Sequence, residues 1–276
     1  MTRNSDGHQY DLNDLLRVMQ RLRDPEGGCP WDRAQDFLTI VPSTLEECYE
    51  LADAIERGDL AHVAEELGDV LFQVIFYCQL GTERDEFDFA VVVDTLVVKL
   101  LRRHPHVFAN GEIEGRLTND TDEAAVKASW ERIKRSERAD KSQHGTLADV
   151  PLALPALVRA QKIQKRAASI GFDWSEVSQV IANLESELAE LKEALTEADA
   201  EHIAEEFGDV LFSAVNLGRH LKIDSESGLR HATHKFEKRF SAMEDLAEER
   251  GDSLMNASPE RLEQLWSHVK SMKGNL

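Results

Sequence analysis

The chain has 276 residues, of which 30% are charged and 7% aromatic, and its formal net charge at pH 7 is −20. This length accommodates two domains of about 100–150 residues, each with a core of its own. The excess of acids argues against binding of duplex nucleic acid, which depends on lysine and arginine, but it is compatible with a small polyphosphate whose charge a metal ion offsets.

The three cysteines, Cys29, Cys48 and Cys78, have no paired spacing, which argues against a disulfide framework or a zinc site. The first residues contain no apolar core of the signal-peptide type. The longest apolar run, residues 70–80, contains two glutamines and is too short to span a bilayer. The sequence therefore predicts a soluble, cytoplasmic protein without a membrane partner.

In the first half of the chain, apolar residues recur at helical spacing over residues 11–23 until the turn formers of residues 24–30 interrupt them. Ser43 and Thr44 are candidate caps for the next helix. Residues 87–103 contain valine runs typical of a strand, but the corresponding second-half segment is less β-branched, so we expect a helix in both. The helices expected in this half cover residues 11–23, 44–57, 60–81, 87–103 and 124–138.

Residues 139–150 have the composition of a linker, which predicts domains at 1–138 and 151–276. The second half repeats the order of the first. Its expected helices cover residues 155–168, 176–197, 200–221, 227–249 and 259–272. The sequence thus predicts an all-α fold of two tandem helical domains.

An acidic motif gives the clearest functional signal. It reads E-E-x-x-E at residues 46–50 and E-x-x-D at residues 66–69. Residues three and four apart share a face of a helix, so two such helices packed together would gather four or five carboxylates. Because these anions repel one another unless a hard cation lies between them, the motif predicts a divalent-metal site. The proposed ligands are Glu47, Glu50, Glu66 and Asp69.

The motif occurs twice. The octet EELGDVLF at residues 65–72 returns as EEFGDVLF at residues 205–212, which indicates a duplication. A glycine in the middle of each predicted helix, Gly68 and Gly208, suggests a close approach between helices. The leading acids Glu46, Glu65 and Glu205 fit a ligand or an exposed surface equally well. The ligands proposed in the second copy are Glu187, Glu190, Glu206 and Asp209.

Cations and tryptophans recur in the same duplication. A lysine and an arginine four residues apart can hold phosphate oxygens, and a tryptophan one turn before a lysine offers a stacking surface beside another phosphate contact. In the alternative reading, the cations pair with surface acids and the tryptophans anchor the core. The positions are Lys99, Arg103, Trp130 and Lys134 in the first copy and Lys235, Arg239, Trp266 and Lys270 in the second.

Other catalytic chemistries have little support. His62 and His202 follow an aspartate in D-x-x-H spacing, whereas carboxylate-bridged di-iron bundles use E-x-x-H. The sequence has no Walker-type glycine loop, no G-x-S-x-G and no Cys/His nucleophile constellation, so covalent catalysis has no candidate.

Taken together, these motifs resemble the MazG nucleoside triphosphate pyrophosphohydrolases over nearly the whole chain. Local strings add to the resemblance: MQRLRDPEGGCPWD at 19–32, RRHPHVFA at 102–109, PALVRAQKIQKRA at 155–167, IGFDW at 170–174 and KFEKRF at 235–240. The resemblance implies an all-α fold in which each domain contributes helices to a dimeric bundle, hence a homodimer. It also implies Mg²⁺-dependent hydrolysis of a nucleoside triphosphate to the monophosphate and diphosphate, with Mn²⁺ as a substitute ion and a house-cleaning role in nucleotide pools.

The resemblance matches the two acid sets to metal ligands and the cations and tryptophans to nucleotide contacts. The second domain commonly carries the activity in such two-domain proteins. There, Glu187 or Glu190 is the candidate that orients or deprotonates the attacking water. One position departs from the pattern, because Ser186 stands where the family has its first glutamate.

Two alternatives of other classes remain open. The chain could be an adaptor that senses a nucleoside triphosphate with Mg²⁺ and regulates a protein partner without turnover, or a purely structural dimerisation protein.

Overall fold

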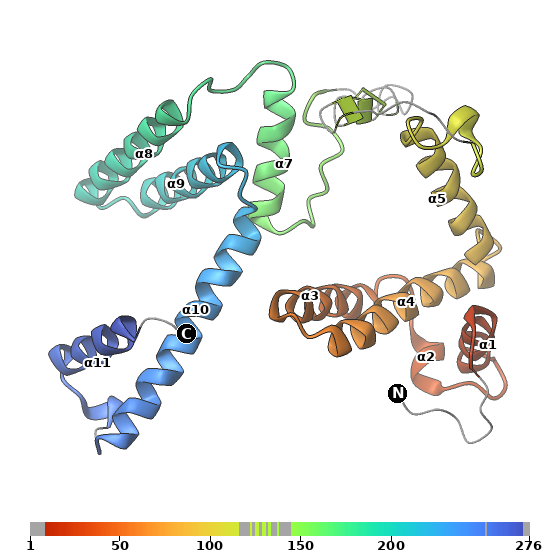
Figure 1. Ribbon diagram of the computed structural model, residues 1–276, viewed down its shortest axis with the longest axis horizontal. Coiled ribbons are helices and arrows are strands. Elements are labelled where there is room, and N and C mark those ends of the chain that lie inside the picture. The colour runs from red at the N-terminus through yellow and green to blue at the C-terminus, as the bar shows by residue number, and fades with distance from the viewer. Residues whose placement is uncertain are drawn as a thin grey trace. The chain divides into compact units, whose positions relative to one another are not determined.

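The computed structural model describes residues 9–115, 122, 125–126, 129–130, 132–133, 137, 145–251 and 253–272. The chain divides into two compact units, residues 1–136 and 137–276. Every regular element in the described residues is helical, which confirms the predicted all-α fold (Figure 1). None of the helices described is both long and apolar enough to cross a membrane.

The helices of the first unit begin and end where local chemistry dictates. Asp11 caps the first helix by accepting hydrogen bonds from the backbone of residues 13 and 14, and Asp59 caps the fourth in the same way. Gly58 ends the third helix with a φ of 73°, a left-handed conformation that glycine adopts without steric cost. The elements are α1 (Leu12–Leu22), α2 (Pro30–Ala34), α3 (Val41–Arg57), α4 (Leu60–Glu83), α5 (Phe89–Arg103) and the 3₁₀ turn η1 (Ala109–Gly111).

Two local expectations for this unit need correction, whereas the helix expected over 87–103 is confirmed as α5. Trp31 and Asp32, expected in a loop, lie in α2, which a proline opens. Ser43 and Thr44 do not cap α3, which begins at Val41. Thr44 Oγ1 lies 3.0 Å from the Ile40 carbonyl oxygen and 2.8 Å from the Tyr77 hydroxyl oxygen.

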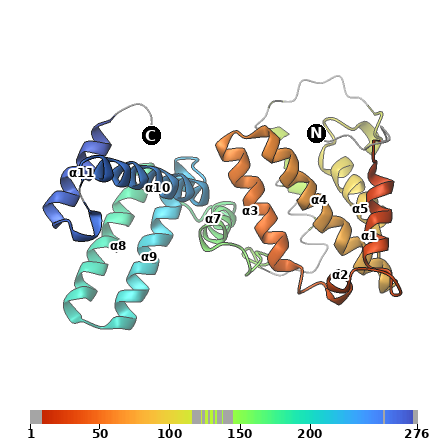
Figure 2. The same cartoon turned by 90° about the horizontal axis from the view of Figure 1, so that it is seen from below.

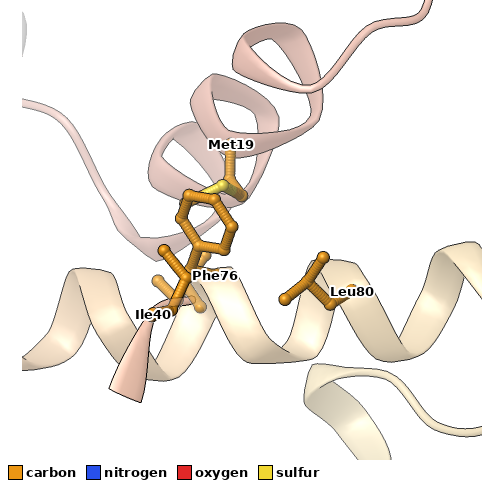
Figure 3. Close-up of a cluster of buried hydrophobic side chains, with 5 residues drawn as sticks. Met19, Ile40, Phe76 and Leu80 are labelled. Carbon is orange, nitrogen blue, oxygen red and sulfur yellow. The ribbon is translucent and has the colours of Figure 1, made fainter. Parts of the chain in front are cut away.

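The core of the first unit lies at one end of α4. Met19 of α1 and Ile40 pack against Ile75, Phe76 and Leu80 of α4 (Figure 3). All five side chains are almost completely buried. The acids at 66 and 69 occupy the other half of α4, which pairs with α3. The core thus anchors α4 and leaves its acidic half in a two-helix hairpin.

The second unit contains a similar helical hairpin (Figure 2) and a hydrophobic core of its own. Its core lies between the last two long helices and consists of Met243, Leu246, Ala247, Leu265 and Val269. The elements are α7 (Ala156–Ala168), α8 (Val177–Glu197), α9 (Ala200–His220), α10 (Ser225–Glu249), the 3₁₀ turn η2 (Leu254–Asn256) and α11 (Pro259–Ser271). Within this unit α10 leads away from the α8–α9 hairpin, and α11 packs against its far half (Figure 1).

The expected close approach at the two mid-helix glycines is wrong. A Cβ built at Gly68 or Gly208 meets no described atom within 4 Å. Both glycines lie on exposed parts of α4 and α9.

Some expectations fall outside the described residues. They include Lys134 and most of the helix expected over 124–138. The linker expected over 139–150 is described only from residue 145.

Candidate functional site

Three carboxylates converge between α3 and α4 in the first unit. Each of Glu47, Glu66 and Asp69 offers a carboxylate oxygen within 4.8 Å of the others. Glu66 is buried. Its Oε1 lies 2.7 Å from His62 Nε2, while its Oε2 is buried and has no hydrogen-bond partner among the described residues. Glu50, predicted as a fourth ligand, is exposed and is not part of this triad.

A second triad lies between α8 and α9. It consists of Glu187, Glu190 and Glu206, whose carboxylate oxygens also lie within 4.8 Å of one another. Glu206 Oε1 lies 3.2 Å from His202 Nε2, and Glu206 Oε2 is buried without a hydrogen-bond partner in the part of the chain that the structure describes. Asp209, the fourth predicted ligand, is exposed and outside the triad. The structure therefore brings together three of the four predicted acids in each unit.

The electrostatics of the first triad favour a cation. Burial raises the pKa of the Glu47 carboxyl, and the negative charges of Asp69, Glu50, Glu66 and Glu46 raise it further. A divalent ion would relieve this repulsion. Carboxylate oxygens are the ligands that hard cations such as Mg²⁺ prefer. Each triad offers a buried oxygen that no described residue bonds. The residues present thus fit a hard divalent ion in both units.

The two histidines beside the triads differ in the partner of Nδ1, which is an arginine for His62 and a glutamate for His202. His62 Nδ1 lies 2.8 Å from Arg57 Nη2, and because a guanidinium only donates, Nδ1 must accept and Nε2 carries the proton donated to Glu66. His202 Nδ1 lies 3.2 Å from Glu197 Oε2, so both ring nitrogens of His202 face carboxylates. The hydrogen bond to Glu197 and the charge of Glu206 raise the pKa of His202.

Sequence reasoning set these histidines aside as metal ligands and missed their contact with the acids. The signal that would have found them is the spacing H-x-x-x-E, which places a histidine one helical turn before a glutamate on the same face. It occurs in both copies, as His62 with Glu66 and His202 with Glu206.

The cations predicted for the second unit lie on α10 and α11. The Trp266 ring packs against Phe236 with 5.3 Å between ring centroids, and Lys270 Nζ lies 5.8 Å from the Trp266 centroid. Lys235 is exposed and Arg239 half-buried. In the described part of the chain, no hydrogen bond or ion pair joins Lys235, Arg239 or Lys270 to the acids of α8 and α9.

In the first unit, Lys99 and Arg103 lie on α5 and are half-buried. The Trp130 ring stands nearly perpendicular to that of His104, with 5.0 Å between centroids. The two tryptophans therefore have different neighbours, a histidine in the first unit and a phenylalanine and a lysine in the second.

Each acidic hairpin is held by an ion pair to the chain that precedes it. Arg219 and His220 of α9 hold Asp173 and lower the pKa of its carboxyl to about 2, the arginine contributing most. In the first unit Arg23 bonds both carboxylate oxygens of Glu83, at 2.7 and 2.6 Å, and lowers its pKa. Ion pairs thus anchor the end of α1 to α4 in the first unit and the loop before α8 to α9 in the second.

The family described as the MazG nucleotide pyrophosphohydrolase domain matches the chain twice, over residues 35–108 and 175–243. The chain belongs to the MazG family. Each matched stretch contains one acidic hairpin with its triad, so the two MazG domains coincide with the two candidate metal centres.

Relatives of similar length support this assignment. The chain is 46% identical over 267 residues to the nucleoside triphosphate pyrophosphohydrolase of Escherichia coli K12, covering 96% of this chain and 99% of that protein. It is 43% identical over 259 residues to the nucleoside triphosphate pyrophosphohydrolase/pyrophosphatase MazG of Thermotoga maritima, covering 94% and 95%. The resemblance predicted from the sequence is confirmed, and with it the predicted class of enzyme, a nucleotide pyrophosphohydrolase.

A more distant relative matches only part of the chain. The nucleoside triphosphate pyrophosphohydrolase of Mycobacterium tuberculosis H37Rv is 37% identical over 164 residues, which cover 58% of this chain and 46% of that protein.

Proposed function

We propose that this chain hydrolyses nucleoside triphosphates, ribo or deoxy, to the monophosphate and diphosphate with Mg²⁺, and that the α8–α9 centre carries the reaction. The observation that supports this most directly is the second triad, in which Glu206 keeps one buried oxygen without a partner beside Glu187 and Glu190. The relatives named above carry this activity in their names.

We assign the metal to the acids of each hairpin. In the second unit Glu187, Glu190 and Glu206 would hold Mg²⁺, with Mn²⁺ as a substitute, and Asp209 on the same helix as Glu206 would complete the ligand set. In the first unit the corresponding residues are Glu47, Glu66 and Asp69, with Glu50. When bound, the ion supplies Lewis-acid polarisation of a phosphoryl oxygen.

One of the acids would also act as the general base of the reaction. Water attacks phosphorus, the anhydride bond between the α- and β-phosphates breaks, and a carboxylate takes the proton of the water. Glu187 and Glu190 are the candidates, because both offer a carboxylate oxygen to the triad and Glu190 is exposed to solvent.

The cations of the last two helices would bind the substrate. Lys235, Arg239 and Lys270 offset the charge that develops on the diphosphate, and Trp266 offers a face to the base. Lys99, Arg103, Trp130 and Lys134 are the corresponding positions in the first unit.

A second copy of the chain would complete the site as a homodimer. The cations of α10 and α11 make no ion pair with the acids within the described part of the chain. Large apolar side chains also remain exposed on α8, α9 and α10, among them Leu188, Phe207, Leu211 and Phe236. Such surfaces mark protein interfaces. Sedimentation equilibrium of the full chain tests this, and a monomer at all concentrations would overturn it.

The reaction is tested by incubating the full chain with Mg²⁺ and a panel of ordinary and damaged nucleoside triphosphates, and by identifying the products as diphosphate or phosphate. Glu206→Gln should lower turnover by about 10³-fold or more, because it removes a ligand charge at constant size. Thr196→Ala, on the exposed face of α8, is the matched control and should keep full activity.

Wild-type turnover in Glu206→Gln would contradict the assignment of the site. Binding of nucleotide by the wild-type chain without any monophosphate product would indicate a sensor instead of an enzyme. A house-cleaning role predicts a higher kcat/KM for damaged nucleotides than for ordinary ones.

A further inference from the structure

Each acid of the second triad accepts a hydrogen bond from the residue one helical turn before it. Residues four apart are neighbours on a helix, so each pair forms within a single helix. In all three cases the acceptor is Oε1, which leaves Oε2 available. The pairs are Asn183 Nδ2 with Glu187 at 3.2 Å, Ser186 Oγ with Glu190 at 2.9 Å, and His202 Nε2 with Glu206 at 3.2 Å.

Two of the three donors are themselves held in place. Asn183 Nδ2 also bonds Ser213 Oγ at 2.9 Å, and Ser213 is buried on α9. An amide group carries two N–H donors, so Asn183 can make both bonds at once and thereby links α8 to α9. His202 Nδ1 faces Glu197 at the end of α8 at 3.2 Å. The donors therefore present the acids from a cross-linked pair of helices.

Among the described residues, the first unit keeps one of the three pairs. The positions that correspond to Asn183, Ser186 and His202 are Ser43, Glu46 and His62. His62 holds Glu66 at 2.7 Å, but no hydrogen bond connects Ser43 to Glu47 in the described residues.

Of the three pairs of corresponding positions, Glu46 and Ser186 differ most between the two units. Glu46 stands one turn before Glu50, where two like charges repel, whereas Ser186 donates to Glu190. This difference parallels the composition of the triads, because Glu190 belongs to the second triad and Glu50 is absent from the first.

We infer that Asn183, Ser186 and His202 are positioning residues, which hold the Oε1 atoms of the three acids so that the remaining oxygens point to a shared cation. Hydrogen-bonding partners behind metal ligands fix ligand orientation, and their loss typically lowers metal affinity by about 10–100-fold. The donor set makes the α8–α9 centre the tighter cation site of the chain. This inference rests on the proposed metal-dependent function.

The direct test measures Mn²⁺ binding to the full chain without nucleotide, by electron paramagnetic resonance titration. Glu66→Gln in every sample removes the strongest candidate ligand of the first unit. In that background Ser186→Ala should raise the Mn²⁺ Kd about tenfold. Ser186→Thr retains the hydroxyl, so its Mn²⁺ Kd should stay within about twofold of that of the Glu66→Gln chain with Ser186 intact. Ser186 is exposed, so neither change disturbs packing.

A second measurement separates positioning from a merely structural role. Asn183→Leu removes both donors at similar size. It should raise the Mg²⁺ concentration needed for half-maximal diphosphate release by about tenfold and leave kcat at saturating Mg²⁺ within about twofold. Thr196→Ala is again the control, because in the described residues its hydroxyl donates to the Glu193 carbonyl on the same helix and to none of the acids of the triad.

The outcomes also separate this inference from the proposed function. If the Glu66→Gln chain with Ser186 intact binds Mn²⁺ and Ser186→Ala leaves the Kd unchanged, the positioning role alone is overturned. A loss of kcat in Asn183→Leu that added Mg²⁺ does not restore would overturn it as well. Tight Mn²⁺ binding by a chain that releases no diphosphate would contradict the enzymatic proposal and leave the positioning role standing.

Discussion

The two acidic hairpins have the same motif and spacing, yet they assemble different triads. The α3–α4 hairpin brings Asp69 to Glu47 and Glu66, whereas α8–α9 brings Glu190 to Glu187 and Glu206. The sequence spacing permits either choice, because the fourth acid lies on the same helical face in both units. The neighbour one turn before the third acid of α3 or α8 differs in parallel, an acid at position 46 in the first unit and a hydroxyl at position 186 in the second. A duplicated motif therefore need not give duplicated geometry.

Substituting one acid of each triad in turn tests most directly whether the two centres contribute differently to activity. Glu206→Gln should lower diphosphate release by about 10³-fold or more, because the second centre loses a ligand charge. Glu66→Gln should leave the rate within about twofold, because in our proposal the α8–α9 centre carries the reaction. Steady-state release of diphosphate checks both variants. Equal losses in the two would show that both centres work.

The two cores allow each unit to be destabilised separately. Phe76→Ala removes a fully buried ring from the first core and should cost about 3–5 kcal/mol, and Leu265→Ala should cost about 2–5 kcal/mol in the second. Calorimetry of each full-length variant should show one transition moving and the other staying in place. If the second unit is the enzyme, only Leu265→Ala shortens the lifetime of activity on heating. A common shift of all transitions would mean that the units unfold together.

The ion pair at Asp173 should make the stability of the second unit depend on pH. The pKa of Asp173 is lowered to about 2, so its stabilising contribution is present above the ordinary value of 3.8 and is lost as pH falls towards 2. Asp173→Asn should lower the stability of the second unit near neutral pH by about 1–2 kcal/mol and flatten its acid dependence. Thermal unfolding between about pH 5 and 3 measures this. A variant with the wild-type slope would show that the pair contributes nothing.

The smallest effect concerns repulsion within the first triad. The pKa of Glu47 is raised, so the folded state favours its protonated form and stability falls as pH rises above the ordinary value of 4.5. At neutral pH without metal, Glu47→Gln should therefore stabilise the first unit by about 0.5 kcal/mol. Urea unfolding in a chelator checks the sign. Added Mg²⁺ should reverse the order, because the wild-type unit gains a bound ion.

Much of the helical architecture could be predicted from the sequence, because helix periodicity and caps are local properties. Asp59 indicated the start of α4, and comparison of the two halves resolved residues 87–103 as a helix despite its valines. The start of α3 and the short α2 were not predicted correctly. In both, a proline in the first turn sets the conformation without a capping side chain.

The acid sites were predicted in type and place but not in detail. Spacing alone put Glu47, Glu66, Glu187 and Glu206 on facing helices. It did not select Asp69 over Glu50 or Glu190 over Asp209, because that choice depends on side-chain rotamers and on how each pair of helices is rotated. It also missed the histidines, whose role depends on which oxygen of the neighbouring acid they bond.

By itself the sequence determined the helical class, the duplication and the two acidic hairpins, because these follow from local periodicity and repeated spacing. It indicated the MazG family through the resemblance of its motifs and local strings. Only the tertiary structure decided which three acids meet, which of their oxygens are already bonded, and that Gly68 and Gly208 face open space. Those features depend on the rotation of one helix against another and on the rotamers this permits. Ser186 illustrates the difference, since it is a departure from the motif in the sequence and a donor to Glu190 in the fold.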